Sequence, residues 1–198
     1  MRKLLVATRS AGKLPEMKSL LMGLPFEIVG INEIPALRDF DVEEVGHTFE
    51  ENAVIKARGF GDKSRLLTLA DDSGLEVDTL HGKPGIRSAR YAPGTDTDRF
   101  FALIQEMDKV PDGARGAQFY SAVALYDPAS GKVETTNGIC RGKILRAPKG
   151  TRGFGYDPIF YADDIEKTFA EATVEEKNAI DHRGKAMTKM RGLLKEFV

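Results

Sequence analysis

Two neighbouring aspartates follow an apolar run in the segment ADDSG at positions 70–74. Adjacent like charges repel, so a counter-cation is expected near Asp71 and Asp72. Mg²⁺ is suited to such a place, because it binds one or two carboxylates together with phosphate oxygens and water. The alternative is a plain Asp/Ser/Gly turn. By itself, the segment favours neither interpretation over the other.

The segment TRSAGK at positions 8–13 has features of a phosphate-binding turn. A strand leads into it and a helix is expected to follow, where free backbone N–H groups attract anions. Lys13 adds a point charge. The GxxxxGK[ST] spacing of a P-loop is absent. Taken alone, the segment is more simply interpreted as an ordinary strand-to-helix turn with a solvated lysine.

A helix is expected over residues 47–63, and its Asn52 and Lys56 lie on one face at i, i+4. That face is otherwise apolar, so the pattern predicts that both polar ends reach into a cleft. Glu43 and Glu44 come just before this helix.

One aromatic residue stands between two glycines in GFGYDPIF at positions 153–160. Because both neighbours of Phe154 lack side chains, the ring is predicted to be uncovered and to offer a platform for a planar base. Such stacking is typically worth about 1–3 kcal/mol. Asp157 is suited to a ribose hydroxyl or a ring N–H. The alternative is a tight turn whose phenylalanine fills the core.

Three hydrogen-bond donors gather near the start of the last helix, at Lys177, His182 and Arg183. Donors favour the carbonyl oxygen of a 6-oxo purine over the amino group of adenine, because two facing donors would be left unpaired. The alternative is a capped helix with exposed charges.

The frame that must position these residues is of the α/β or α+β class, with a long hairpin. Strands are expected at 3–8, 26–31, 117–127 and 132–144, and residues 66–78 are expected to form a strand, an acidic turn and a second strand. Helices are expected at 11–24, 47–63, 98–110, 173–180 and 181–197. Thr48 and Thr173 begin capping boxes, and residues 81–97 are predicted to form a long functional loop.

The composition limits the possible partners. The 198 residues, 41% hydrophobic and 30% charged, can form one large domain or two small lobes with a normal core. The net charge of −1 gives no broad basic surface for nucleic acid. The single Cys140 fits a reducing compartment, and no run approaches the roughly 20 apolar residues of a membrane span. We therefore expect a cytoplasmic protein without nucleic-acid or membrane partners.

Together, these motifs resemble the inosine/xanthosine triphosphate pyrophosphatase family, house-cleaning enzymes that act on non-standard purine nucleotides. The matching segments are ATRSAGK, TFEENAVIKA, ADDSGLEVD, PGIRSARYA, GFGYDPIF and EEKNAIDHRGKA, between about residues 4 and 190. The resemblance implies a single domain over residues 1–198, of α/β fold. It implies a long central mixed β-sheet flanked by helices, in two lobes with the active cleft between them. It also implies a homodimer and Mg²⁺.

The resemblance further implies that water attacks the α-phosphorus of ITP, dITP or XTP, which releases pyrophosphate and leaves the monophosphate. Catalysis would rest on Asp72, as proton acceptor, and Lys13, and Mg²⁺ would bind Asp72 and Glu44. The substrate-binding residues implied are Thr8, Arg9, Ser10, Ala11, Gly12, Lys13, Lys56, Ser73, Phe154, Gly155, Tyr156, Asp157, Lys177, His182 and Arg183. The last three would read the 6-oxo edge.

Two positions depart from the family pattern. Ser10 stands where relatives usually carry asparagine, and Asp181 replaces the more usual serine before His182. Both bear on substrate preference rather than on the type of reaction. Two alternatives stay open: hydrolysis of modified or pyrimidine triphosphates, and nucleotide binding without catalysis. Clustered carboxylates argue against the second, because a pure binder has little need of them beside a polyanion.

Overall fold

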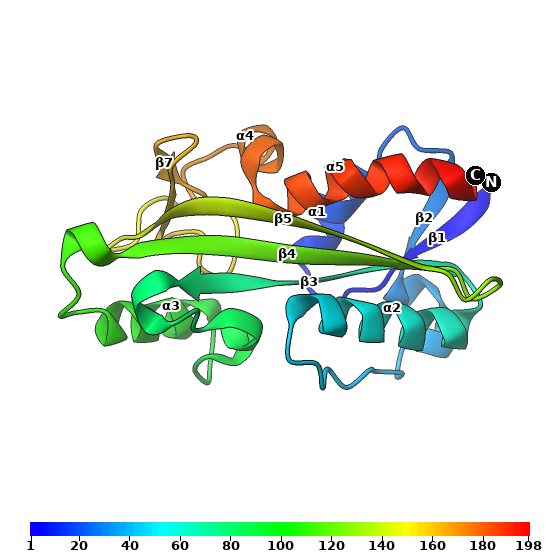
Figure 1. Cartoon of the computed structure of the whole chain (residues 1–198), viewed down its shortest axis with the longest axis horizontal. Helices are drawn as coiled ribbons and strands as arrows, with labels where there is room; N and C mark the ends of the chain where they lie inside the picture. Colours follow the sequence, from blue (N-terminus) through cyan, green and yellow to red (C-terminus); the bar gives the residue numbers. More distant parts are fainter. The chain divides into compact units, whose positions relative to one another are not determined.

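The computed structural model describes residues 1–198 (Figure 1). The strands are β1 (Arg2–Val6), β2 (Phe26–Gly30), β3 (Leu67–Val77), β4 (Gly116–Tyr126), β5 (Val133–Ile144), β6 (Phe160–Ala162) and β7 (Lys167–Thr168). The α-helices are α1 (Lys13–Leu20), α2 (Phe49–Ser64), α3 (Asp96–Glu106), α4 (Val174–Ile180) and α5 (His182–Leu194). The 3₁₀ helices are η1 (Ile31–Glu33), η2 (Pro35–Leu37), η3 (Asp78–Leu80), η4 (Gly85–Arg90), η5 (Asp112–Ala114) and η6 (Lys195–Phe197).

A seven-stranded mixed sheet organises the fold, in the order β2-β1-β3-β4-β5-β6-β7. Strand β1 runs parallel to β2 and β3, whereas β6 is antiparallel to β5 and β7. The apolar run in β1 is explained by this topology, because a parallel strand inside a sheet has helices on its faces. The predicted α/β fold, an open mixed sheet flanked by helices, is confirmed.

The chain divides into two compact units, each with its own apolar core. Unit 1 contains residues Met1–Asp72, Ser121–Gly138 and Arg183–Val198, and unit 2 contains Ser73–Tyr120 and Ile139–His182. Strands β3, β4 and β5 contribute residues to both units.

In unit 1, helices α1 and α5 lie on one side of the strands and α2 lies on the other (Figure 1). The core on the α1 and α5 side includes Leu4, Met17, Leu69 and Met187, all fully buried. Arg2 donates to the backbone oxygen of Phe197 at 3.0 Å and ties the two ends of the chain together.

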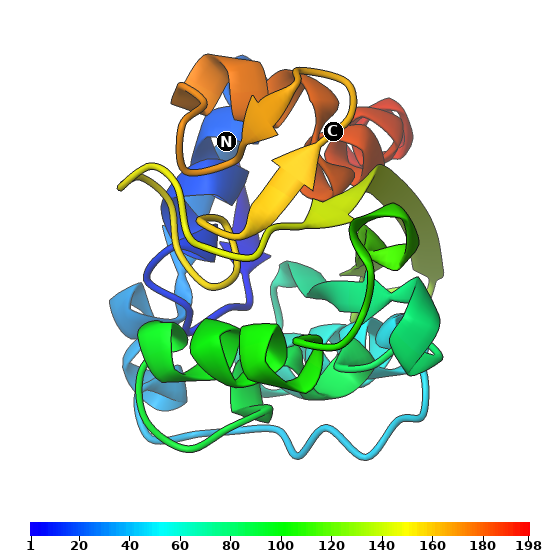
Figure 2. The same cartoon turned by 90° about the vertical axis from the view of Figure 1, so that its left-hand side faces the viewer.

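In unit 2, α3 lies on one side of the strands and α4 lies on the other (Figure 2). Aromatic rings fill its core: the Phe119 ring centroid lies 4.7 Å from that of Phe160 and 5.6 Å from that of Phe169. The predicted capping box at Thr173 forms, and Thr95 with Asp98 makes another at the start of α3. None of the helices combines the length and apolar character that crossing a bilayer requires.

The prediction of a strand, an acidic turn and a second strand at 66–78 is wrong, because β3 runs unbroken through Asp71 and Asp72. Turn propensity is a local preference, and the partners that each aspartate finds outside the strand outweigh it. Only half of the capping box predicted at Thr48 forms. Its hydroxyl accepts from the Glu51 N–H at 3.1 Å, but the Glu51 carboxylate accepts from the His47 N–H.

Candidate active site

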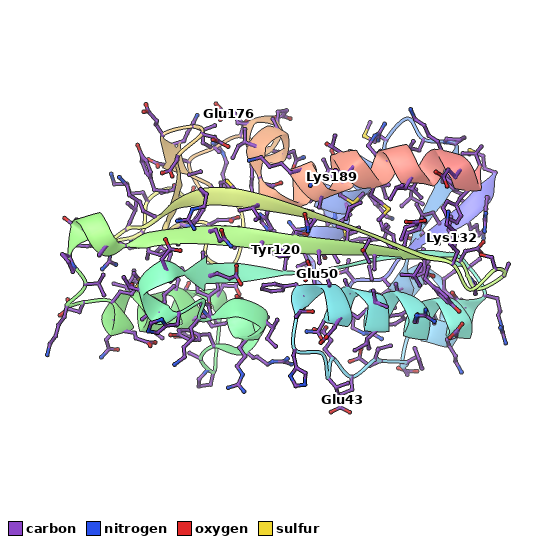
Figure 3. All side chains as sticks on the ribbon, in the orientation of Figure 1. Glu43, Glu50, Tyr120, Lys132, Glu176 and Lys189 are labelled. Atoms are coloured by element: carbon purple, nitrogen blue, oxygen red, sulfur yellow. The ribbon has the colours of Figure 1, made fainter.

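Asp72 is fixed from helix α2. Side chains alternate along a strand, and the Asp72 side chain is the one that meets this helix. Its Oδ2 accepts from Asn52 Nδ2 at 3.1 Å, and its Oδ1 lies 3.5 Å from Lys56 Nζ. The prediction that Asn52 and Lys56 point the same way is therefore confirmed. Lys56 Nζ also lies 3.2 Å from Glu44 Oε1, whereas the neighbouring Glu43 points away from the ribbon (Figure 3).

Burial raises the pKa of Asp72, even though Lys56 and Lys13 act against it. Burial alone would lower the pKa of Lys56, but Asp72, Asp71 and Glu44 outweigh it, so that the pKa is raised. The result is a charged lysine held between two carboxylates, one of which binds a proton more readily than an ordinary aspartate.

Asp71 faces the other side of β3 and joins helices α1 and α5. Its Oδ1 lies 3.3 Å from Lys13 Nζ, and its Oδ2 accepts from Arg183 Nε at 3.3 Å. Arg183 also donates to the carboxylate of Glu16. Burial would raise the pKa of Asp71, but Lys13 and Arg183 outweigh it and hold the pKa well below its usual range. Positively charged groups were expected beside the two aspartates. The side chains of Lys13, Lys56 and Arg183 supply them.

The segment 8–13 forms a turn that leads into α1. The Ser10 N–H donates to Thr8 Oγ1 at 3.2 Å, and Ser10 Oγ accepts from the Lys13 N–H at 3.3 Å. Ser10 therefore shapes the turn with its hydroxyl, in the place where an asparagine was expected. Gly12 is the N-cap of α1 and supplies no side-chain cap. Burial lowers the pKa of Lys13, which is only partly offset by Asp71.

Arg9 points to a different part of unit 1. Its guanidinium donates to the backbone oxygens of Leu37, Arg38 and Phe40, the last at 2.5 Å. In this structure Arg9 holds the loop after η2, and its role in substrate binding stays a prediction.

In unit 2, the two glycines beside Phe154 serve the turn itself. Gly153 has φ +77° and Gly155 has φ +62°, where side chains are disfavoured. A Cβ at Gly153 would lie 2.0 Å from the Asp157 carboxylate, so this position has no room for one. The same carboxylate accepts from the Phe154 N–H at 2.9 Å and from Lys177 Nζ at 2.8 Å.

The Phe154 ring is partly buried, and the expectation that it has no cover is wrong for one of its faces. Lys177 Nζ lies 4.8 Å from its centroid, because the lysine crosses the ring to reach Asp157. A base that stacks on this ring would have to use the opposite face or displace the lysine.

The other predicted base-binding residues of unit 2 are mostly buried. His182 stacks on Phe119, with ring centroids 4.7 Å apart and an angle of 12° between the planes. The hydroxyl of Tyr156 donates to the backbone oxygen of Ser88 at 2.9 Å, and burial raises the pKa of this tyrosine. His182 belongs to unit 2. The next residue, Arg183, belongs to unit 1 and contacts Asp71 there.

Sequence reasoning missed Glu16, which pairs with Arg183. A signal was available, since Glu16 lies three residues after Lys13 and therefore on the same face of α1. It also missed Asp96, whose Oδ2 accepts from the Gly155 N–H at 2.8 Å, because no local pattern links positions so far apart.

The sequence profile of the Ham1 family matches residues 4–193, nearly the whole chain. The chain belongs to the Ham1 family. This family member is 47% identical over 189 residues to the dITP/XTP pyrophosphatase of Symbiobacterium thermophilum, covering 95% of the chain and 92% of that relative. It is 41% identical over 200 residues to the dITP/XTP pyrophosphatase of Bacillus cereus, covering 100% of the chain and 97% of the relative.

The solved structure of a HAM1 protein from Coxiella burnetii matches with a TM-score of 0.88 at 38% identity, covering 99% of this chain and 100% of that one. The Ham1 protein of Staphylococcus aureus matches with a TM-score of 0.87 at 35% identity, covering 100% of both chains. The predicted family is confirmed. The predicted class of enzyme is confirmed too, because the curated relatives are nucleoside triphosphate pyrophosphatases.

Proposed function

We propose that this chain hydrolyses ITP, dITP and XTP to the nucleoside monophosphate and pyrophosphate, with Mg²⁺. The observation that carries the proposal is the arrangement around Asp72. This carboxylate is 7% exposed, and Lys56 lies between it and Glu44. Support also comes from curated relatives named dITP/XTP pyrophosphatase that align over almost the entire chain.

In this proposal Lys13 and Lys56 bind the polyphosphate together with the turn at 8–13. Their positive charges offset the negative charge that develops on the leaving pyrophosphate. Asp72 takes the proton from the attacking water. Its raised pKa brings it closer to neutral pH, which makes it a better proton acceptor than an ordinary aspartate.

Glu44 and Asp72 fit the coordination chemistry of Mg²⁺. Both carboxylates already approach one cationic group, Lys56 Nζ, at 3.2 Å and 3.5 Å. Mg²⁺ commonly uses one or two protein carboxylates and fills its remaining positions with water and substrate phosphates. When bound, it would polarise phosphate oxygens and offset their charge.

The base would stack on Phe154, with Lys177 and His182 as donors to a 6-oxo group and Asp157 near the sugar. Arg183, the third predicted donor, is buried against Asp71 and Glu16, so its part in reading the base stays a prediction.

The same proposal includes a homodimer that works in the cytoplasm without nucleic-acid or membrane partners. Phe101 on α3 is 49% exposed and offers an apolar contact for a second copy. Light scattering after size-exclusion chromatography tests the dimer, and a monomer at micromolar concentration would contradict it.

The test of the function is a substrate panel of ITP, XTP, dITP, ATP, GTP and dTTP, each with Mg²⁺ and with EDTA. We expect pyrophosphate from the first three, little from the others, and none with EDTA. Preferential hydrolysis of dTTP would favour a pyrimidine or modified-nucleotide pyrophosphatase. Binding of ITP without turnover would indicate a nucleotide-binding protein.

A further inference from the structure

The Phe154 turn, residues 153–157, is held by a residue outside its own motif. Asp96 is the first residue of α3, and its Oδ2 accepts from the Gly155 N–H at 2.8 Å. Its other oxygen, Oδ1, lies 3.2 Å from Arg99 NH2. The carboxylate is thus fixed on one side by its own helix and holds the turn with the other.

Asp96 is not needed to start the helix on which it lies. The capping box of α3 is made by Thr95 and Asp98, whose side chains satisfy each other's backbone N–H groups. This leaves the Asp96 carboxylate available for a contact outside the helix.

A second contact holds the same turn from η4. The Tyr156 hydroxyl donates to the backbone oxygen of Ser88 at 2.9 Å. Ser88 is itself fixed, because its Oγ accepts from the Leu75 N–H at 2.9 Å and donates to the Gly85 oxygen at 2.6 Å. Tyr156 is therefore anchored to β3 through η4, whereas the flexible residue Gly155 depends on Asp96.

We propose that Asp96 is a positioning residue for the nucleobase. By accepting from the Gly155 N–H, it holds this glycine at φ +62° and so sets the direction in which the Phe154 ring is presented. Within the turn, Asp157 accepts from the Phe154 N–H and is itself held by Lys177. The inference rests on the proposed function, in which the base stacks on Phe154.

The experiment compares Asp96→Ala with Asp98→Ala, a matched loss of a first-turn carboxylate from the same helix. Two ligands are titrated calorimetrically: the α,β-methylene analogue of ITP, which has a base, and inorganic tripolyphosphate, which has none. Asp96→Ala should weaken the affinity for the nucleotide analogue about tenfold or more, as expected for one lost hydrogen bond to a charged group. It should leave the affinity for tripolyphosphate unchanged. Asp96→Asn, which keeps an acceptor oxygen, should recover most of the loss.

Asp98→Ala should lower the melting temperature without changing the ratio of the two affinities. Unchanged affinity of Asp96→Ala for the nucleotide analogue would overturn the inference, and so would an equal loss for both ligands. If the alanine variant does not fold, the inference is tested by hydrogen exchange of the Gly155 amide in the wild-type protein. Exchange as fast as that of an amide without a hydrogen bond would overturn the inference. Failure of the wild-type protein to bind the analogue at all would instead overturn the proposed function.

Discussion

At the scale of single residues, two consecutive aspartates have separate environments. Asp72 meets Asn52 and Lys56, and Asp71 meets Lys13 and Arg183. That Asn52 and Lys56 lie on one helical face was predictable from their i, i+4 spacing, although their meeting with Asp72 was not. The pairing of Asp71 with Lys13 was not predictable either, because it also joins distant parts of the sequence and periodicity describes only neighbours. The two side chains therefore allow a matched pair of substitutions.

We expect Asp72→Asn to lower kcat by a factor of about 10²–10⁴, as for loss of a general base. Binding of the α,β-methylene analogue of ITP should persist, because Asn is nearly the same size as Asp and Lys13 and Lys56 remain. Pyrophosphate release and calorimetry measure the two quantities. A kcat within a factor of five of the wild-type value would remove Asp72 from the mechanism.

The matched change Asp71→Asn should act mainly on stability. It leaves the partly buried Lys13 and the buried Arg183 beside a neutral group, which we expect to reduce the free energy of unfolding by about 3 kcal/mol. Urea denaturation followed by circular dichroism measures this. A loss below about 0.5 kcal/mol would show that the Asp71 contacts do not hold unit 1 together.

The lowered pKa of Asp71 also predicts a pH dependence. A carboxylate with a depressed folded-state pKa contributes stability that is present above its unfolded pKa of about 3.9 and is lost as pH falls toward the folded value. Between pH 5 and pH 3, the urea midpoint of the wild-type protein should therefore fall more steeply than that of Asp71→Asn. Parallel curves for the two proteins would contradict the assignment.

At the scale of elements, the turn at 153–157 shows what a sequence pattern can and cannot predict. The two glycines correctly marked an unusual backbone, but the reason proposed for them, an uncovered ring, does not hold for the face that Lys177 crosses. Whether a glycine permits a positive φ or leaves room for a neighbour depends on atoms brought in by the fold, here the Asp157 carboxylate. The same holds for β3, where long-range ion pairs outweigh the local turn signal.

The turn glycines give a matched prediction. Gly153→Ala should destabilise the protein by at least about 3 kcal/mol, since it adds both a left-handed strain and a clash with Asp157. Gly155→Ala has nothing within 4 Å of the added Cβ and should cost only about 1 kcal/mol. Thermal denaturation of both variants checks the order, and equal losses would contradict it.

Arg115 supports a further prediction for the elements of unit 2. It is 2% exposed, and its guanidinium donates to the backbone oxygens of Met107, Ile144 and Leu145, joining α3 to the end of β5. Arg115→Met should lower stability by about 3 kcal/mol, because it leaves buried carbonyl groups without donors. Arg115→Lys should recover only part of the lost stability, because one ammonium group cannot reach all three backbone oxygens. An unchanged melting temperature for Arg115→Met would refute this role.

At the scale of the whole molecule, the sequence predicted the α/β class and most of the elements. The alternating strands at 117–127 and 132–144 correspond closely to β4 and β5. The division into two units was not visible as a linker, because the chain passes between them inside continuous strands and between His182 and Arg183. A residue pattern shows which face of a helix or strand is apolar. Which residues share a core depends on which of these faces pack together in the fold.

The central claim is that water attacks the α-phosphorus of a non-standard purine triphosphate. Hydrolysis of XTP in H₂¹⁸O, with the products separated and weighed by mass spectrometry, tests this most directly. We predict one ¹⁸O atom in the xanthosine monophosphate and none in the pyrophosphate. Label in pyrophosphate, or the release of labelled orthophosphate with a nucleoside diphosphate, would contradict it.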